Sequence, residues 1–306
     1  MSIMLRAAAL ALFAIAPWSG ASAQNYPTRL VHVIAPYGPG GPSDVFSRIV
    51  TQKLSDALKQ SFVVENRPGA STMIGTEAVA KAAPDGYTLL IISQTHATNE
   101  SLVTNKSFQL LRDFVPVAPI YSGDLMLVVH KSVPVKTLKE FIALAKAHLA
   151  GELFKTMIGT DIVHVPYKGS TGARNDILGG QVQMMFDTIP TMNPTVEAGL
   201  VRALGTTGET RSPILHDIPT ISEAGVPGFV ASGWVGIVAP AGTPKPIVDL
   251  LNTEINKILN SAEIKESWAK QGVAPLSMTS AEFGVFIKAE IEKWAKVART
   301  AGVKIN

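Results

Sequence analysis

Short apolar runs alternate with amphipathic stretches along the first third of the chain, and this order predicts parallel strands joined by helices. The runs Leu30–Ala35, Phe62–Val64 and Thr88–Ile92 lack strict alternation, which is typical of strands buried on both faces of a sheet. Residues 44–58 and 74–82 carry apolar side chains at roughly helical spacing. The order strand, helix, strand, helix, strand predicts an α/β fold with a parallel sheet.

The stretch 161–187 has the same pattern of strand, loop, helix and strand. Apolar runs at Ile162–Val165 and Val182–Phe186 flank a helical segment from Ala173 to Leu178. Ligands of parallel sheets bind beyond the carboxyl ends of the strands, so we expect a binding edge here. The residues at these ends are Tyr167, Lys168, Gly169, Ser170 and Asp187.

Further strands and two capped helices are predicted in the rest of the chain. Leu125–Val129, Val201–Gly205 and Trp234–Ala239 are apolar runs of strand length. Thr137 and Thr279 each precede a helical pattern and are followed three positions later by a glutamate, the sequence signature of a capping box.

The N-terminal residues predict an export signal. Arg6 precedes an apolar stretch, residues 7–16, and Ala21-Ser22-Ala23 forms a small-residue cleavage site. The stretch is much shorter than the ~20 residues of a membrane span. We therefore expect residues 1–23 to be removed and the mature protein to be exported in soluble form.

Composition narrows the possible functions. Of the 306 residues, 46% are hydrophobic and 17% charged, which favours an ordered chain of two ordinary domains. The 27 basic and 24 acidic residues balance closely and form no basic run, which argues against nucleic-acid binding. The absence of cysteine excludes thiol catalysis and cysteine-ligated metals, and export without disulfides fits the bacterial periplasm.

The loop Gly38–Ser43 nearly matches the dinucleotide fingerprint G-x-G-x-x-G. However, Ser43 replaces the third glycine, two prolines remove N–H donors, and an exported chain does not meet NAD. We expect the glycines and the N-terminus of the next helix, with Ser43 as its N-cap, to bind a smaller anion such as a carboxylate. A tight turn without a ligand is the alternative.

The remaining polar residues leave several interpretations open. No histidine pair has metal-site spacing and no G-x-S-x-G elbow is present, so neither a metal nor hydrolase chemistry is predicted. His96, in the polar loop 93–99, either faces a ligand or is a hydrogen-bonded loop residue. Asp187 either accepts a ligand hydrogen bond or caps the next helix. Lys168 either contacts an anion or is simply exposed.

Several motifs in order resemble the extracytoplasmic solute receptors of the tripartite tricarboxylate transporter type, the Bug family. They include VIAPYGPGGPSD at 33–44, IGTEAVAKAAPDGYTLL at 74–90, ILGGQVQMMFDTI at 177–189 and WVGIVAPAGTPKPIVDLLN at 234–252. The resemblance spans nearly the whole mature chain. It implies a fold like that of type II periplasmic binding proteins, with two α/β lobes and a ligand cleft between them.

The resemblance also implies boundaries, partners and site residues. Residues 24–122 with 233–306 would form the first lobe and 123–232 the second. The ligand would be a small organic acid, delivered to membrane permease subunits, with no cofactor, no metal and no nucleic acid. The implied ligand-binding residues are Tyr37, Gly40, Gly41, Ser43, Asp44, Ser93, His96, Asn99, Tyr167, Lys168, Gly169, Ser170 and Asp187.

One departure from the family pattern lies after Ala147. The helix ending there runs directly into His148-Leu149-Ala150-Gly151, whereas the family has a strand and a Gly/Ser-rich loop between these segments. We therefore expect the second lobe to lack its first strand. Alternative functions are a degenerate receptor copy that binds nothing, a sensor that presents its ligand to a membrane kinase, and an exported enzyme on the same fold, for which no acid–base or nucleophile constellation is present.

Overall fold

The first three strands of the computed structural model form the parallel sheet that the sequence predicts. The structure describes residues 26–103, 105–147, 165, 167 and 170–301. Strand β1 (Val31–Ala35) lies between β2 (Phe62–Asn66) and β3 (Thr88–Ser93), and both pair with it in parallel. The carboxyl ends of β1 and β3 therefore meet at one edge of the sheet.

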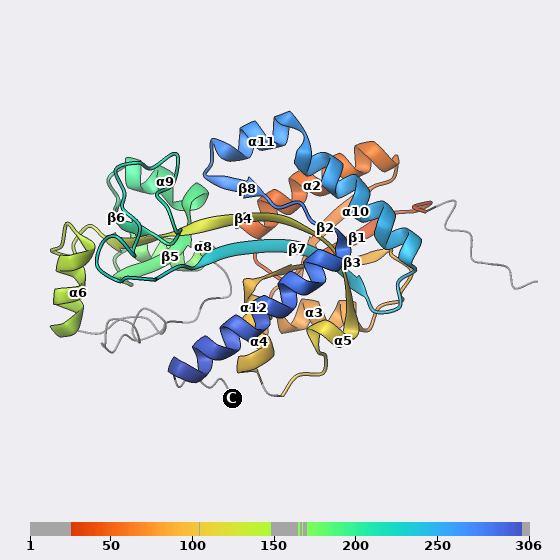
Figure 1. Ribbon diagram of the computed structural model, residues 1–306, viewed down its shortest axis with the longest axis horizontal. Coiled ribbons are helices and arrows are strands. Elements are labelled where there is room, and N and C mark those ends of the chain that lie inside the picture. The colour runs from red at the N-terminus through yellow and green to blue at the C-terminus, as the bar shows by residue number, and fades with distance from the viewer. Residues whose placement is uncertain (1–25, 104, 148–164, 166, 168–169, 302–306) are drawn as a thin grey trace, which may run out of the picture.

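Two long antiparallel strands continue this sheet and extend along the molecule (Figure 1). Strand β4 (Phe114–His130) pairs with β7 (Ser232–Pro240) as far as Asp124 and with β8 (Val273–Pro275) on its other side. From Leu125 onward, β4 pairs instead with β5 (Met184–Thr188) and β6 (Val201–Thr206).

This change of partners divides the described elements into two groups. We call β1–β3, β7, β8 and the first part of β4, with the helices packed on them, the first lobe. We call β5, β6 and the second part of β4, with their helices, the second lobe. Both β5 and β6 are antiparallel to β4.

Helices cover both faces of the first-lobe sheet (Figure 1). On one face lie α2 (Pro42–Leu58), α10 (Lys245–Asn260) and α11 (Ala262–Ala269). On the other face lie α3 (Met73–Ala80), α4 (Gln94–Leu102), α5 (Leu110–Asp113) and α12 (Ser280–Ala301), with the short 3-10 helix η2 (Ala70–Thr72) preceding α3. The second lobe contains α6 (Leu138–Ala147), α8 (Ser170–Leu178) and α9 (Ile189–Glu197).

Apolar side chains hold each layer to the sheet. Phe46 of α2 and Trp268 of α11 pack against Tyr121 of β4 on one face. On the other face, Phe283 of α12 and Trp234 of β7 belong to a buried cluster that continues into the second lobe. A smaller cluster packs α8 and α9 onto the second part of β4.

Several predicted details are confirmed and others are corrected. The Thr279–Glu282 capping box forms as predicted. At α6, Thr137 accepts from the Glu140 N–H, but the Glu140 carboxylate accepts from the N–H of Lys136. Helix α2 starts at Pro42 with Gly41 as its N-cap, so the prediction of Ser43 as the cap is wrong by two positions because Pro42 is already helical.

The segment 93–99 is also corrected, because it is helical and not a loop. Ser93 caps α4 by accepting a hydrogen bond from the Thr95 N–H, which starts a helix in a stretch of polar residues. The predicted strand Ile162–Val165 and the expected loss of a strand after Ala147 fall largely on residues 148–164, outside the described part. Within the described part, no helix has the length and apolar character of a membrane span.

Candidate functional site

The glycine-rich loop after β1 is held in place by Asp44. The two carboxylate oxygens of Asp44 accept from the Gly40 N–H (3.0 Å), from Arg48 Nε (3.0 Å) and from Asn66 Nδ2 (2.9 Å). Gly40 has φ of 78°, a left-handed conformation that favours glycine. Burial by itself would raise the pKa of Asp44, but these hydrogen bonds and the charge of Arg48 lower it overall. Asp44 is therefore ionised and fixes the position of the loop through its hydrogen bonds.

Tyr37, Ser93 and His96 form a connected group beside this loop. The Tyr37 hydroxyl lies 2.8 Å from Ser93 Oγ and 3.1 Å from His96 Nδ1. The Ser93 N–H donates to the same His96 nitrogen, which therefore carries no proton. The three residues come from the carboxyl ends of β1 and β3, which the parallel sheet brings together.

His96 is neutral and bonded on both ring nitrogens. Its Nε2 lies 3.0 Å from the Thr76 hydroxyl, which itself donates to the Thr72 carbonyl. Complete burial lowers the pKa of His96 to about 3. Of the two interpretations that the sequence left open, these contacts favour a histidine that positions Tyr37 and Ser93.

Asn99 also has a partner in its own lobe. Its Nδ2 donates to the Ser71 carbonyl at 2.7 Å. Ala70, Ser71 and Thr72 all have positive φ, an unfavourable conformation for residues other than glycine. Asn99 thus stabilises a strained turn, and its ligand-binding role stays a prediction.

The N-terminus of α8 in the second lobe faces the glycine loop. A Cβ atom placed on Gly41 would lie 3.6 Å from Ser170 Oγ. The first N–H groups of a helix have no partner within it, and they carry a partial positive charge. The N-termini of α2 and α8 therefore approach one another across the two lobes.

Arg174 and Asp187 form a buried ion pair behind the first turn of α8. Arg174 Nε lies 3.5 Å from Asp187 Oδ2, and the two side chains are 20% and 6% exposed. Neither atom has a hydrogen-bond partner among the described residues. Burial raises the pKa of Asp187, although the Thr188 N–H, Arg174 and Thr191 act in the opposite direction.

Tyr121 links the two lobes at the middle of β4. Burial raises the pKa of the Tyr121 hydroxyl, a hydrogen bond with Ser43 lowers it and the charge of Asp187 raises it. Ser43, although not the helix cap, thus belongs to the same group as the predicted residue Asp187.

Tyr167 lies apart from this group. Its hydroxyl donates to Asp176 Oδ2, and its ring packs beside Gly172. Gly172 and Asp176 are four positions apart on one face of α8, while Ser170 and Arg174 occupy another. Lys168 and Gly169 lie outside the described residues.

The sequence reasoning missed Tyr121 and Arg174. Tyr121 is followed by Ser122, Gly123 and Asp124 in the middle of an otherwise apolar strand, a break that could have marked it. Arg174 follows Ser170 by four residues, so helical spacing places both on one face. The described residues contain no cluster of histidine, aspartate and glutamate that could hold a metal ion.

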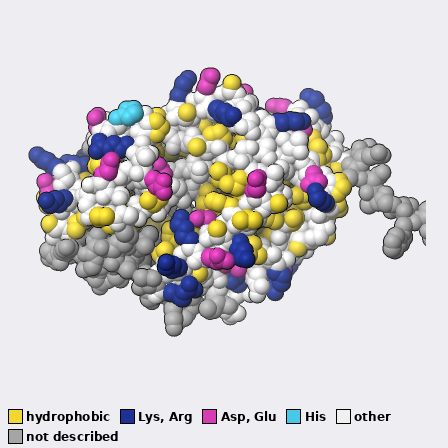
Figure 2. Space-filling model, in the orientation of Figure 1, with side chains coloured by type: hydrophobic (Ala, Val, Ile, Leu, Met, Phe, Trp, Pro, Cys, Tyr) yellow, Lys and Arg dark blue, Asp and Glu magenta, His cyan; other side chains and the backbone are white. Residues whose placement is uncertain are grey.

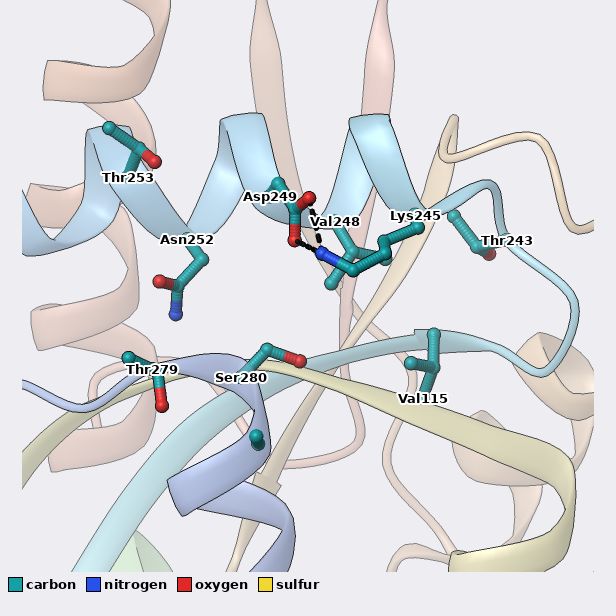
Figure 3. A pocket seen from close by; sticks show the side chains of 10 residues that line it. Val115, Thr243, Lys245, Val248, Asp249, Asn252, Thr253, Thr279 and Ser280 are labelled. Carbon is teal, nitrogen blue, oxygen red and sulfur yellow. Dashed lines mark hydrogen bonds and ion pairs between the residues drawn. The ribbon is translucent and has the colours of Figure 1, made fainter.

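Two hollows elsewhere involve none of the predicted site residues. One of about 540 Å³ lies between α10 and the start of α12 (Figure 3), where Lys245 pairs with Asp249 and Asn252 donates to backbone carbonyls. The other, of about 340 Å³, is lined by residues that include Asp124 and Ser232. On the face in Figure 2, acidic and basic side chains are intermixed.

The α/β fold, with two groups of elements joined by long strands (Figure 1) and with the N-termini of α2 and α8 close to one another, is that of the periplasmic binding proteins. The family described as tripartite tricarboxylate transporter family receptor, TctC, matches residues 46–303. The chain belongs to this family.

Known relatives support this assignment over most of the chain. Protein BugT of Bordetella pertussis is 38% identical over 303 residues, which cover 93% of each chain. The structure of Rpa4515 of R. palustris with adipate has a TM-score of 0.88 and 36% identity, covering 91% of this chain and 99% of that one. MatC of Rhodopseudomonas palustris with bound malate has a TM-score of 0.83 and 31% identity, covering 89% and 99%.

Proposed function

We propose that this protein is a periplasmic receptor that binds a small carboxylate between its lobes and delivers it to a membrane permease without chemical conversion. The observation that carries the proposal is the close approach of two helix N-termini from different lobes, with a Cβ on Gly41 only 3.6 Å from Ser170 Oγ. Backbone N–H groups and helix dipoles at such ends attract an anion. The adipate and malate in the similar structures are carboxylates of this kind.

The predicted export signal supports the periplasmic location. Residues 1–23 have a basic start, a short apolar stretch and a small-residue cleavage site. A receptor released by cleavage after Ala23 would be free to diffuse between its ligand and a permease.

The change of partners along β4 supports closure of the lobes around the ligand. β4 leaves β7 after Asp124, and β7 starts at Ser232, close to the predicted boundaries of 122/123 and 232/233. We propose that the chain moves as two bodies, 24–122 with 233–306 and 123–232. A ligand that contacts both bodies stabilises the closed form.

Isothermal titration calorimetry with a panel of mono-, di- and tricarboxylates tests this function. We expect saturable binding of at least one acid at one site per chain. Gly41→Val should abolish binding, because its side chain would project toward Ser170 Oγ and fill the space between the lobes. A melting curve checks that this variant folds. Absence of binding to every acid would contradict the proposal.

Closure can be measured separately because the chain has no cysteine. Cysteines introduced at Ala57 and Ala198, both exposed and in different lobes, can carry a fluorescence donor and acceptor. We expect the transfer efficiency to change on addition of the acid that binds, and to stay constant in Gly41→Val.

A further inference from the structure

Arg174 is the basic residue of α8 and lies near the N-terminus of that helix. Ser170 faces Gly41 across the lobes, and Arg174 lies one helical turn later on the same face. Long side chains on a helix point back toward its N-terminus. Arg174 Nη2 accordingly donates to Thr171 Oγ1 in the first turn, at 3.3 Å. The guanidinium therefore adds its charge to the positive end of α8.

Asp187 lies next to the Arg174 guanidinium but forms no hydrogen bond with its Nε–H. The Nε–Oδ2 distance of 3.5 Å is too long for a good hydrogen bond, and both atoms are buried without a hydrogen-bond partner among the described residues. An arginine has five N–H donors, and only that to Thr171 forms a hydrogen bond with a described residue. Donors of Arg174 thus remain without a partner among the described residues.

In the first lobe, the start of α2 beside Gly41 is the feature that can attract an anion, because the first N–H groups of a helix have no partner within it. The Gly40 N–H and Arg48 are already bonded to Asp44. Each lobe therefore offers one positive feature, the N-terminus of α2 in the first lobe and the N-terminus of α8 with Arg174 in the second. A ligand with negative charge at both ends fits this arrangement better than one with a single charge.

We propose that Arg174 binds the second carboxylate of a dicarboxylate and that Asp187 is its positioning residue, so that this pair sets a preference for dicarboxylates. The proposal rests on the proposed carboxylate binding. In the closed complex the guanidinium bridges Asp187 and the ligand, with its Nε–H on the aspartate and its terminal N–H groups on the ligand carboxylate.

The test compares dicarboxylates of four to seven carbons, adipate among them, with their monoamides, in which an amide of equal size replaces one carboxylate. Calorimetry on the purified protein should show tighter binding of at least one dicarboxylate than of its monoamide. Arg174→Gln should weaken dicarboxylate binding by about 10- to 100-fold, the effect expected for hydrogen bonds to a charged group. Its affinity for the monoamide should change by less than about threefold.

Matched variants test whether the preference for the dicarboxylate over its monoamide comes from Arg174. Arg211→Gln removes the same charge from the same lobe, at an exposed pair with Glu223, and should leave the ratio of the two affinities unchanged. Arg174→Lys keeps the charge without the planar fork and should restore part of the ratio. Asp187→Asn should lower the ratio without abolishing monoamide binding.

The possible outcomes distinguish a failure of the proposed function from a failure of the role proposed for Arg174. If the wild-type protein binds none of these acids and no other carboxylate, the proposed function fails. If it binds acids but prefers no dicarboxylate over its monoamide, or if Arg174→Gln keeps the preference, the role of Arg174 is overturned while the proposed function stands. If ammonium-bearing acids bind best and Asp187→Asn alone abolishes their binding, Asp187 is itself the ligand contact and the proposal is wrong.

Discussion

Two aspartates on opposite walls of the candidate site are equally buried but differ in their surroundings. Asp44 is 4% exposed and Asp187 is 5% exposed. Asp44 accepts hydrogen bonds from a backbone N–H, an arginine and an asparagine, and its pKa is lowered. One oxygen of Asp187 has no hydrogen-bond partner among the described residues, and its pKa is raised.

The difference indicates that the two lobes make different contributions. In the first lobe, Asp44, His96 and Asn99 are bonded to their own lobe, so the wall is formed before a ligand arrives. In the second lobe, Arg174 and Asp187 retain unused hydrogen-bonding capacity that a ligand can complete. The preformed first lobe suits the carboxylate group that all ligands of the proposed class share. The second lobe, with its unused hydrogen-bonding capacity, suits the part of the ligand that differs from one acid to another.

The largest expected effect is on stability, from Asp44→Ala. The substitution leaves Asn66 Nδ2, Arg48 and the Gly40 N–H without their acceptor, and we expect a loss of about 2–4 kcal/mol in the free energy of unfolding. Urea denaturation at pH 7 measures it. Asp56→Ala, an exposed aspartate of the same helix, is the control and should change stability by less than about 0.5 kcal/mol. Equal losses of unfolding free energy in the two variants would show that the hydrogen bonds of Asp44 do not stabilise the first lobe, and would contradict the contrast drawn between Asp44 and Asp187.

A second effect comes from His96 and depends on pH. Its pKa is lowered from 6.5 to about 3 in the folded protein, so the unfolded chain binds more protons between these values. Stability should therefore fall as the pH decreases below about 6.5, by about 2 kcal/mol at pH 5. Urea denaturation from pH 7 to 5 should show this slope in the wild type and a smaller one in His96→Gln.

If His96→Gln does not fold, a direct measurement on His96 of the wild-type protein tests the same prediction. The ring signals of His96 in a nuclear magnetic resonance titration should not shift between pH 7 and 5. A titration midpoint near 6.5 would show that His96 is solvated and that the first-lobe wall is not preformed.

The smallest expected effect is that of Asp187→Asn on the unliganded protein. Because burial disfavours the charge and Oδ2 lacks a hydrogen bond, a neutral amide should change the free energy of unfolding by less than about 1 kcal/mol at pH 7. The raised pKa of Asp187 also means that its charged form costs stability as the pH rises through that pKa. Urea denaturation beside Asp44→Ala tests this, and an equally large loss would make Asp187 as structural as Asp44.

Much of the first lobe could be predicted from local pattern. The apolar runs at β1, β2 and β3 and the glycine loop after β1 are visible because each depends on residues close in sequence. The helix at 94–102 was missed because its residues are mostly polar and form no apolar stripe at helical spacing. Only the Ser93 cap, with a hydrogen bond from the Thr95 N–H, reveals where it starts.

The sequence by itself indicated the family, through motifs that occur in the same order along the chain, and the parallel arrangement of the first strands, through the periodicity of apolar residues. The candidate site residues came mainly from the resemblance to that family. Only the tertiary structure decided which of those residues work as a group. Tyr121, Ser43, Arg174 and Asp187 are separated by up to 144 positions and meet because β4 passes from one lobe into the other. Burial and hydrogen-bond partners, which determine the charge and freedom of each side chain, exist only once that crossing has formed.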